Sequence, residues 1–174
     1  KEHEGILMLY SGKQADSYEY AGRVRLLQNG QEAMLGYMLE CPNYYEENQK
    51  GVLFCSPMGI SSENKFDYKN VFSVVYMVGK PLDTERKEFH FSEMYELDKG
   101  FDFYAPQSFL DESGRRILIG WMGIPDADYT NPTTQAGWQH ALTLPRVLHW
   151  KEGRLVQSPV PELQQMRCNE RTYA

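Results

Sequence analysis

Short hydrophobic runs, interrupted about every ten residues by Gly, Pro, Asn or Asp, make up most of the 174-residue chain. The runs are rich in Val, Ile, Leu, Phe and Tyr, which favour β-strands because their side chains pack well on a pleated surface. Only residues 161–167 have the pattern of a helix, so the sequence predicts an all-β protein. Strands are expected at residues 6–10, 18–27, 44–46, 52–56, 71–78, 89–95, 103–110, 116–120, 139–144 and 155–157.

Two predicted hairpins resemble each other and lie about 62 to 64 residues apart. The first runs from Glu40 to Gly59 and the second from Asp102 to Gly123; each opens with an acid and closes on Met-Gly. Two further strand-like runs follow each hairpin, which gives the four strands of a β-propeller blade. Residues 116–122 are apolar on both faces, as expected for a strand packed between blades. The alternative is a β-sandwich with two accidentally similar hairpins.

Composition excludes several functional classes. The chain has 18 basic and 24 acidic residues, a net charge of −6, and no concentrated basic segment, so nucleic acid is not an expected partner. The longest strongly apolar run, residues 71–78, is far shorter than the roughly 20 residues of a membrane-spanning helix, so no membrane contact is expected. The three cysteines form no C-x-x-C pair, which predicts neither a disulfide framework nor a metal site and favours a cytoplasmic location. Cofactor-binding motifs are absent, and no cofactor is expected.

The candidate chemistry lies in acids that stand among apolar residues. Glu40 follows an apolar strand entry, where desolvation favours a protonated carboxyl and suits a general acid, although a solvated Glu at a strand end is the simpler alternative. Asp102 is surrounded by aromatic residues, where an unpaired charge would be costly. Asp98 lies in an ordinary turn sequence, and Trp121 could be a core residue.

Four segments together resemble glycoside hydrolase family 32, which contains the invertases and sucrose-6-phosphate hydrolases. The similarity extends from about Gly5 to Arg167, with the motifs in the family's order. The four segments are residues 38–43 (MLECPN), 101–107 (FDFYAPQ), 116–123 (RILIGWMG) and 137–146 (GWQHALTLPR).

This resemblance implies a five-bladed β-propeller followed by a β-sandwich. The chain would supply the end of blade three together with blades four and five. Residues 1–160 would then be part of the catalytic propeller domain, and residues 161–174 would begin the connection to a C-terminal sandwich that this sequence lacks.

The resemblance also implies a reaction, the hydrolysis of terminal β-fructofuranosides with retention, on sucrose, sucrose 6-phosphate or a fructan. Glu40 matches the acid/base of the family's Glu-Cys-Pro motif, while the flanking Asn43 replaces the family's usual Asp. Neither the Asn-Asp-Pro motif of the nucleophile nor the Arg-Asp-Pro motif occurs in the sequence, so the chain alone is expected to be inactive. The alternative is a non-catalytic, carbohydrate-binding propeller. The expected sugar contacts are Cys41, Asp98, Asp102, Tyr104 and Trp121.

Overall fold

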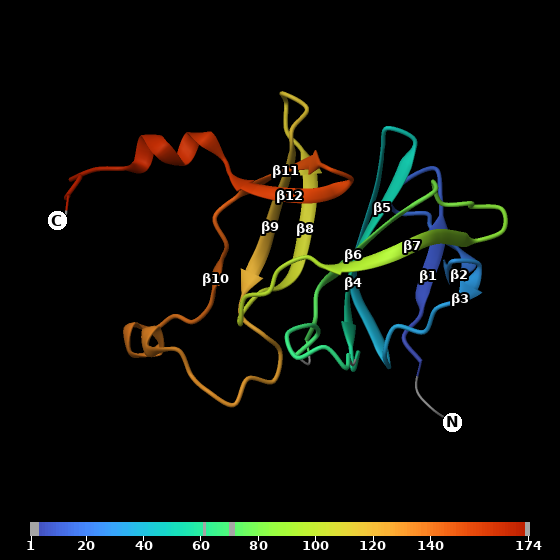
Figure 1. Ribbon diagram of the computed structural model, residues 1–174, viewed down its shortest axis with the longest axis horizontal. Helices are drawn as coiled ribbons and strands as arrows, with labels where there is room; N and C mark the ends of the chain where they lie inside the picture. Colours follow the sequence, from blue (N-terminus) through green and yellow to red (C-terminus); the bar gives the residue numbers. More distant parts are fainter. Residues whose placement is uncertain (1–3, 61, 70–71, 173–174) are drawn as a thin grey trace.

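The computed structural model describes residues 4–60, 62–69 and 72–172, and within these ranges the fold is built from β-strands. The strands form two sheets that lie side by side, with strands β1 to β7 in one and β8 to β12 in the other (Figure 1). No helix in the described ranges is long and apolar enough to cross a membrane.

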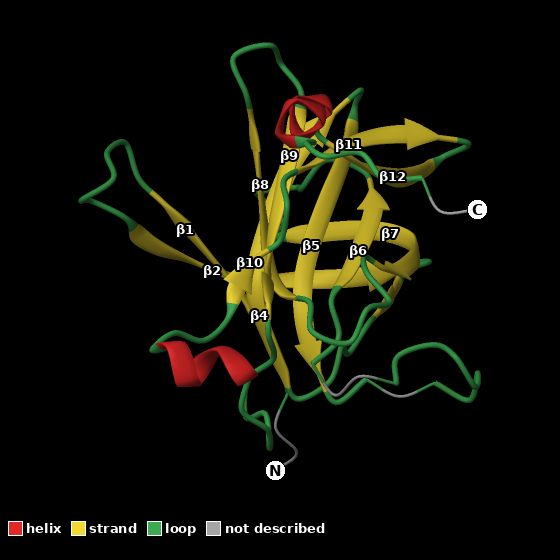
Figure 2. Cartoon of the chain, turned by 90° about the vertical axis from the view of Figure 1, so that its left-hand side faces the viewer, coloured by secondary structure: helices red, strands yellow, loops and turns green. Residues whose placement is uncertain are grey.

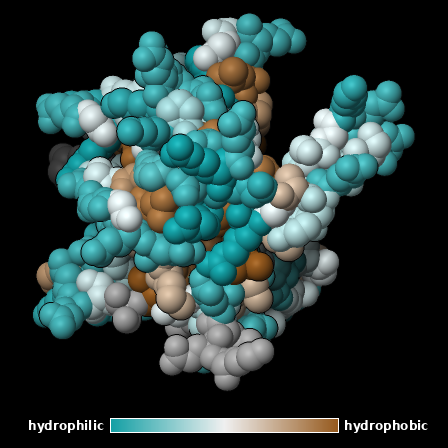
Figure 3. All heavy atoms as spheres, turned by 90° about the vertical axis from the view of Figure 1, so that its right-hand side faces the viewer, coloured by the Kyte–Doolittle hydropathy of each residue, from teal (hydrophilic) through white to brown (hydrophobic). Residues whose placement is uncertain are grey.

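The first sheet contains one four-stranded antiparallel unit, which we call the first complete blade. Its order from the inside outward is β4, β5, β6 and β7, and β7 then pairs in parallel with β2 of an N-terminal hairpin. The face that carries this hairpin is mostly hydrophilic, with hydrophobic residues in separate patches (Figure 3). The elements are β1 (Leu7–Ser11), β2 (Glu19–Gln28), β3 (Gln31–Glu32), β4 (Met38–Glu47), β5 (Lys50–Met58), β6 (Val75–Gly79) and β7 (Glu88–Glu96).

The second sheet repeats this arrangement as the second complete blade. Its order is β8, β9, β11 and β12, and the short strand β10 pairs with the end of β9. The innermost strands of the two blades, β4 and β8, lie next to each other (Figure 2). The elements are β8 (Tyr104–Leu110), β9 (Arg116–Met122), the 3₁₀ helix η1 (Pro132–Ala136), β10 (Ala141–Leu142), β11 (Arg146–Lys151), β12 (Arg154–Pro159) and the 3₁₀ helix η2 (Pro161–Met166).

Hydrophobic residues form two core clusters, one on each side of the first complete blade. Strand β5 is buried on both faces because alternate side chains enter different clusters. Leu53 packs toward the N-terminal hairpin, whereas Phe54 packs toward the second complete blade. Leu118 of β9 enters the latter cluster and is fully buried. Burial between the blades therefore fixes how β4 and β8 approach each other.

The all-β prediction and the two four-stranded units are confirmed, but several boundaries differ. Strand β4 begins at Met38 rather than residue 44, because a bulge interrupts the pattern that the sequence shows there. Strand β6 begins at Val75 rather than residue 71, which lies outside the described residues. The sequence pattern does not predict strands β3 and β11, because β3 is only two residues long and β11 directly follows residues 139–144, which the pattern predicts as one strand. The predicted helix at 161–167 is the 3₁₀ helix η2.

Candidate active site between the two blades

A β-bulge near the start of β4 sets the direction of the Glu40 side chain. The β4–β5 register shifts between Glu40 and Asn43, and the intervening Cys41 has a left-handed backbone with φ 49°. Bulges of this kind bend a strand and redirect a side chain, and they are frequent beside active sites. The sequence Glu-Cys-Pro therefore forms the β-bulge and also contains the candidate acid.

Strand β8 contains the same kind of β-bulge. Its register with β9 shifts between Tyr104 and Gln107, and Ala105 is left-handed with φ 48°. Tyr104 is thus the counterpart of Glu40, 64 residues later in the chain. The spacing of 64 residues lies within the expected 62 to 64, and the shared bulge aligns Glu40 with Tyr104 rather than with Asp102, the acid that opens the second hairpin.

The two equivalent side chains meet. The hydroxyl of Tyr104 donates a hydrogen bond to Oε2 of Glu40 at 2.8 Å. Tyr104 is only 2% exposed, whereas Glu40 is half-buried. Burial, followed by the hydrogen bond and the charge of Glu40, raises the pKa of Tyr104, so the phenol remains a donor across the physiological pH range.

The residues opposite this pair are also equivalent in the two blades. Ser56 lies opposite Glu40 in the β4–β5 register, and Trp121 lies opposite Tyr104 in the β8–β9 register. The Tyr104 and Trp121 rings meet edge to face at 6.4 Å, and His140 packs against Trp121 at 5.0 Å. A carboxyl, a phenol, a buried hydroxyl and an indole therefore come together where β4 and β8 begin.

Further hydrogen bonds join β4 to β8 beside Glu40. Asn43 Oδ1 accepts from the backbone N–H of Ser108 at 3.2 Å and from its hydroxyl at 2.6 Å. Gln107 donates a longer bond of 3.5 Å to the carbonyl of Cys41. Burial, and secondarily the charge of Glu40, raises the pKa of the Cys41 thiol, which therefore stays neutral rather than becoming a nucleophilic thiolate.

Asp98 is placed away from this pair, in the connection between β7 and β8. Its Oδ2 accepts a charge-assisted hydrogen bond from Arg146 Nη1 at 2.6 Å. Arg146 also donates to Gln157 at 2.8 Å and lies over the Phe103 ring at 4.9 Å. Asp98 is thereby tied to the outer strands of the second complete blade.

Asp102 lies at a groove beside the same connection. Its carboxylate accepts a hydrogen bond from the hydroxyl of Tyr129, and this bond is the main cause of the raised pKa of Tyr129. The groove has a volume of about 660 Å³, and Phe66 and Phe101 on its walls are 73% and 93% exposed. Aromatic faces beside carboxylates are suited to stack against and hydrogen-bond a sugar.

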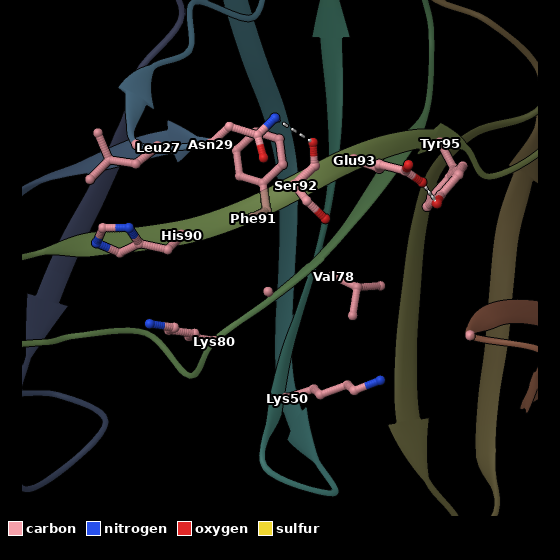
Figure 4. Close-up of a pocket in the computed structure, with 13 residues that line it drawn as sticks. Leu27, Asn29, Lys50, Val78, Lys80, His90, Phe91, Ser92, Glu93 and Tyr95 are labelled. Atoms are coloured by element: carbon pink, nitrogen blue, oxygen red, sulfur yellow. Dashed lines mark hydrogen bonds between the residues drawn. The ribbon is translucent and has the colours of Figure 1, made fainter.

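Another hollow, of about 520 Å³, lies between β7 and the β4–β5 turn and contains none of the predicted site residues (Figure 4). Among its lining residues, Asn29 donates to the backbone carbonyl of Ser92 at 3.4 Å, and Tyr95 donates to the Glu93 carboxylate. Nowhere in the described ranges do three His, Cys, Asp or Glu side chains gather in a way that could hold a metal ion.

The structure thus brings Glu40, Tyr104 and Trp121 together and places the predicted Asp98 and Asp102 in an adjoining region. Sequence reasoning missed the contributions of Ser56 and Arg146. Arg146 is the last residue of the segment 137–146, but the sequence pattern assigns it no role. Ser56 could have been found only by aligning the second strands of the two hairpins as well as the first.

Comparison with known proteins supplies curated relatives. The chain is 43% identical over 175 residues to a sucrose-6-phosphate hydrolase of Vibrio alginolyticus, with 100% of the chain and 35% of the relative covered. It is 41% identical to a sucrose-6-phosphate hydrolase of Staphylococcus xylosus, with 97% and 33% covered. The chain therefore spans about a third of the length of these relatives.

Solved structures show the same fold. A sucrose-6-phosphate hydrolase from Lactobacillus gasseri superposes with a TM-score of 0.80 at 30% identity, covering 95% of this chain and 33% of that one. A family 32 β-fructofuranosidase from Bombyx mori gives a TM-score of 0.79 at 29% identity, covering 97% and 35%, and it has also been solved as a mutant in complex with sucrose. The two complete blades and the N-terminal hairpin are thus part of a five-bladed β-propeller.

The family model of the glycosyl hydrolases family 32 N-terminal domain matches residues 1–159, which include every strand described above. This chain belongs to glycosyl hydrolases family 32.

Proposed function

We propose that the chain is the acid/base-bearing part of a hydrolase that cleaves terminal β-fructofuranosides with retention of configuration. The observation that carries this proposal is the Glu40 carboxyl, half-buried between two inner strands and held by Tyr104 at 2.8 Å. A carboxyl fixed in this way can exchange a proton with a glycosidic oxygen, which is the role of the acid in glycoside hydrolysis.

In the proposed mechanism Glu40 first protonates the leaving-group oxygen while a second carboxylate attacks the anomeric carbon. Glu40 then removes a proton from the water that hydrolyses the fructosyl ester. A retaining enzyme needs its two carboxyl groups about 5 to 5.5 Å apart. Because the sequence contains neither Asn-Asp-Pro nor Arg-Asp-Pro, we propose that a segment outside these residues supplies the nucleophile.

We propose sucrose or sucrose 6-phosphate as the substrate. Relatives named as sucrose-6-phosphate hydrolases at 43% and 41% identity support this, as does the sucrose complex of the Bombyx mori enzyme. We propose that the groove beside Asp102, with its exposed Phe66 and Phe101, contacts the sugar. Cys41, Asp98 and Trp121 remain proposed contributors to sugar binding.

The proposed domain boundary follows the end of the last strand. Strand β12 ends at Pro159 and the chain continues as η2, so residues 1–160 would belong to the catalytic propeller and residues 161–174 to a connection toward a sandwich domain. The three cysteines are unpaired, which supports the proposal of a cytoplasmic enzyme.

The test uses a complete hydrolase in which residues 1–159 replace the matching segment of the Vibrio alginolyticus relative. We expect release of fructose from sucrose 6-phosphate or sucrose, and a loss of about 10² to 10⁴-fold in the Glu40→Gln variant. Glu46→Gln is the matched control, since Glu46 is an exposed carboxylate on the same strand. The 174-residue chain by itself should release no fructose.

A carbohydrate-binding propeller without catalysis is the second candidate, favoured by the exposed aromatic walls of the groove. Equilibrium dialysis with labelled sucrose separates the two. Sugar binding by a complete chimera that never releases fructose, with or without Glu40→Gln, would contradict the hydrolase and support the binding module. Equal turnover in Glu40→Gln and its control would remove Glu40 from the mechanism.

A further inference from the structure

We infer that Tyr104 is a positioning residue that determines which oxygen of Glu40 delivers the proton. Its hydroxyl donates to Oε2 at 2.8 Å, and no other described residue hydrogen-bonds the carboxyl. With Oε2 engaged by this donor, Oε1 is the oxygen left to carry a proton toward a substrate. This inference deepens, and rests on, the proposed role of Glu40 as the acid/base.

The Tyr104 ring is fixed on two sides, so its hydroxyl has a defined direction. Phe72 meets the ring edge to face at 5.8 Å, and Trp121 does so at 6.4 Å. The left-handed backbone at Ala105 sets the position of the preceding Tyr104. A donor held by packing costs little conformational entropy when it engages Glu40, which is what a positioning role requires.

The direction of donation to the charged carboxyl is also fixed. Burial comes first among the causes that raise the pKa of Tyr104, followed by its bond to Glu40, so the phenol keeps its proton and donates to the Glu40 carboxylate. The buried hydroxyl of Ser56 has no hydrogen-bond partner among the described residues, yet it acts on Tyr104 in the direction of a lower pKa, which opposes the larger effects.

Tyr104 donates to both protonation states of Glu40, but the bond is stronger to the charged state. It therefore favours the carboxylate that must act as base in the second half of the reaction. The groups that face Glu40 from the packed strands are Cys41 on β4, Ser56 on β5 and Tyr104 on β8, and of these only Cys41 and Tyr104 titrate.

The first test follows the side-chain carboxyl signal of Glu40 by ¹³C NMR in the full 174-residue chain, assigned with Glu40→Gln. We expect the chemical shift of this carboxyl signal at neutral pH to change in Tyr104→Phe, because the carboxylate loses a hydrogen-bond donor. Tyr45→Phe is the matched control: Tyr45 is also a buried tyrosine, on β4, and its hydroxyl has no hydrogen-bond partner in the described residues. An identical carboxyl signal in the wild type and Tyr104→Phe would overturn the inference.

The second test uses the complete chimeric hydrolase. In Tyr104→Phe kcat should fall about tenfold with KM nearly unchanged, because the Glu40 carboxyl is no longer held in one orientation. A raised KM with an unchanged kcat would instead make Tyr104 a substrate contact and overturn the positioning role. If the chimera has no activity, the proposed function fails while the NMR comparison still decides the inference.

Discussion

In the first complete blade the bulge of the inner strand presents a carboxyl, and in the second complete blade the same bulge presents a phenol. The backbones agree closely, with φ 49° at Cys41 and 48° at Ala105, each followed by proline. The side chains at the preceding position, Glu40 and Tyr104, differ in chemistry and form a hydrogen bond to each other. The repeated β-bulge thus brings a carboxyl and a phenol into contact, and the phenol can orient the carboxyl.

The hairpin turns of the two blades differ where the bulges do not. The first hairpin closes with the two residues Asn48 and Gln49, both with positive φ, as in a type I′ turn. The second closes with the three residues 112–114, and Gly114 supplies the positive φ. The extra residue lies at the exposed tip, so it lengthens the hairpin without moving the bulge. The two blades therefore differ in the backbone of the turn and agree in the backbone of the bulge.

The largest effect should come from removing the packing that holds the blades together. Leu118 and Leu53 occupy equivalent positions in β9 and β5, and they are 0% and 4% exposed. Leu118→Ala and Leu53→Ala should each lower the free energy of unfolding by about 2 to 5 kcal/mol, measured by chemical denaturation.

Only Leu118→Ala should loosen the contact between the blades, because Leu118 lies in the cluster between them and Leu53 lies on the other side of the first complete blade. The amide of Ser108, which donates to Asn43 across this contact, should then exchange with solvent faster relative to global unfolding. Equal exchange of this amide in both variants would show that the cluster does not set the approach of β4 and β8.

A smaller effect is expected from the bulge itself. Ala105→Val places a β-branched side chain at φ 48°, a conformation that such residues rarely adopt, and should cost about 1 to 3 kcal/mol. Ala105→Gly is the control, because glycine adopts this backbone without strain. The stability gained from relieving that strain is largely offset by the larger conformational entropy of glycine in the unfolded chain. Thermal unfolding measures both. An Ala105→Val protein as stable as the wild type would mean that the left-handed backbone is not needed.

The sequence was sufficient for the fold because hydrophobic alternation and the repeated hairpin depend on local pattern. The sequence was not sufficient to align the two repeats. Cys41 and Ala105 adopt a left-handed backbone, and because neither is a glycine, the residue type does not indicate that conformation. The sequence pattern therefore left the spacing at 62 to 64 residues, and Tyr104, the counterpart of Glu40, was expected only as a sugar contact.

Contacts between distant segments were also beyond the sequence pattern. Arg146 and Asp98 are 48 residues apart and meet because β11 folds back over the connection between the blades. Nothing in the composition of either segment selects this partner, as many other acids could pair with an arginine. The candidate acid came from a family motif, whereas the groups that surround it depend on three-dimensional packing.

The smallest expected effect is a difference in how the stability of the two hairpin turns depends on pH. Burial raises the pKa of Asp111, but hydrogen bonds from Arg115 and Ser113 outweigh it and lower the pKa from 3.8 to about 2. The ionised form is favoured in the folded state, so its contribution is fully present above pH 3.8 and is lost as the pH falls toward 2. Glu47 at the equivalent place in the other turn instead accepts a bond from the Trp150 indole at 2.7 Å.

Amide hydrogen exchange measured between pH 5 and pH 2 should therefore show the second turn opening in acid. After correction for the intrinsic effect of pH on exchange, the amides of Ser113 and Arg115 should exchange faster at pH 2 than at pH 5. Asp111→Asn should remove most of this pH dependence, because the amide cannot gain or lose the stabilising charge. Its stability should be lower than that of the wild type at neutral pH, and the two should converge near pH 2. A wild type and Asp111→Asn that respond alike to acid would mean that other carboxyl groups, not this turn, distinguish the two hairpins.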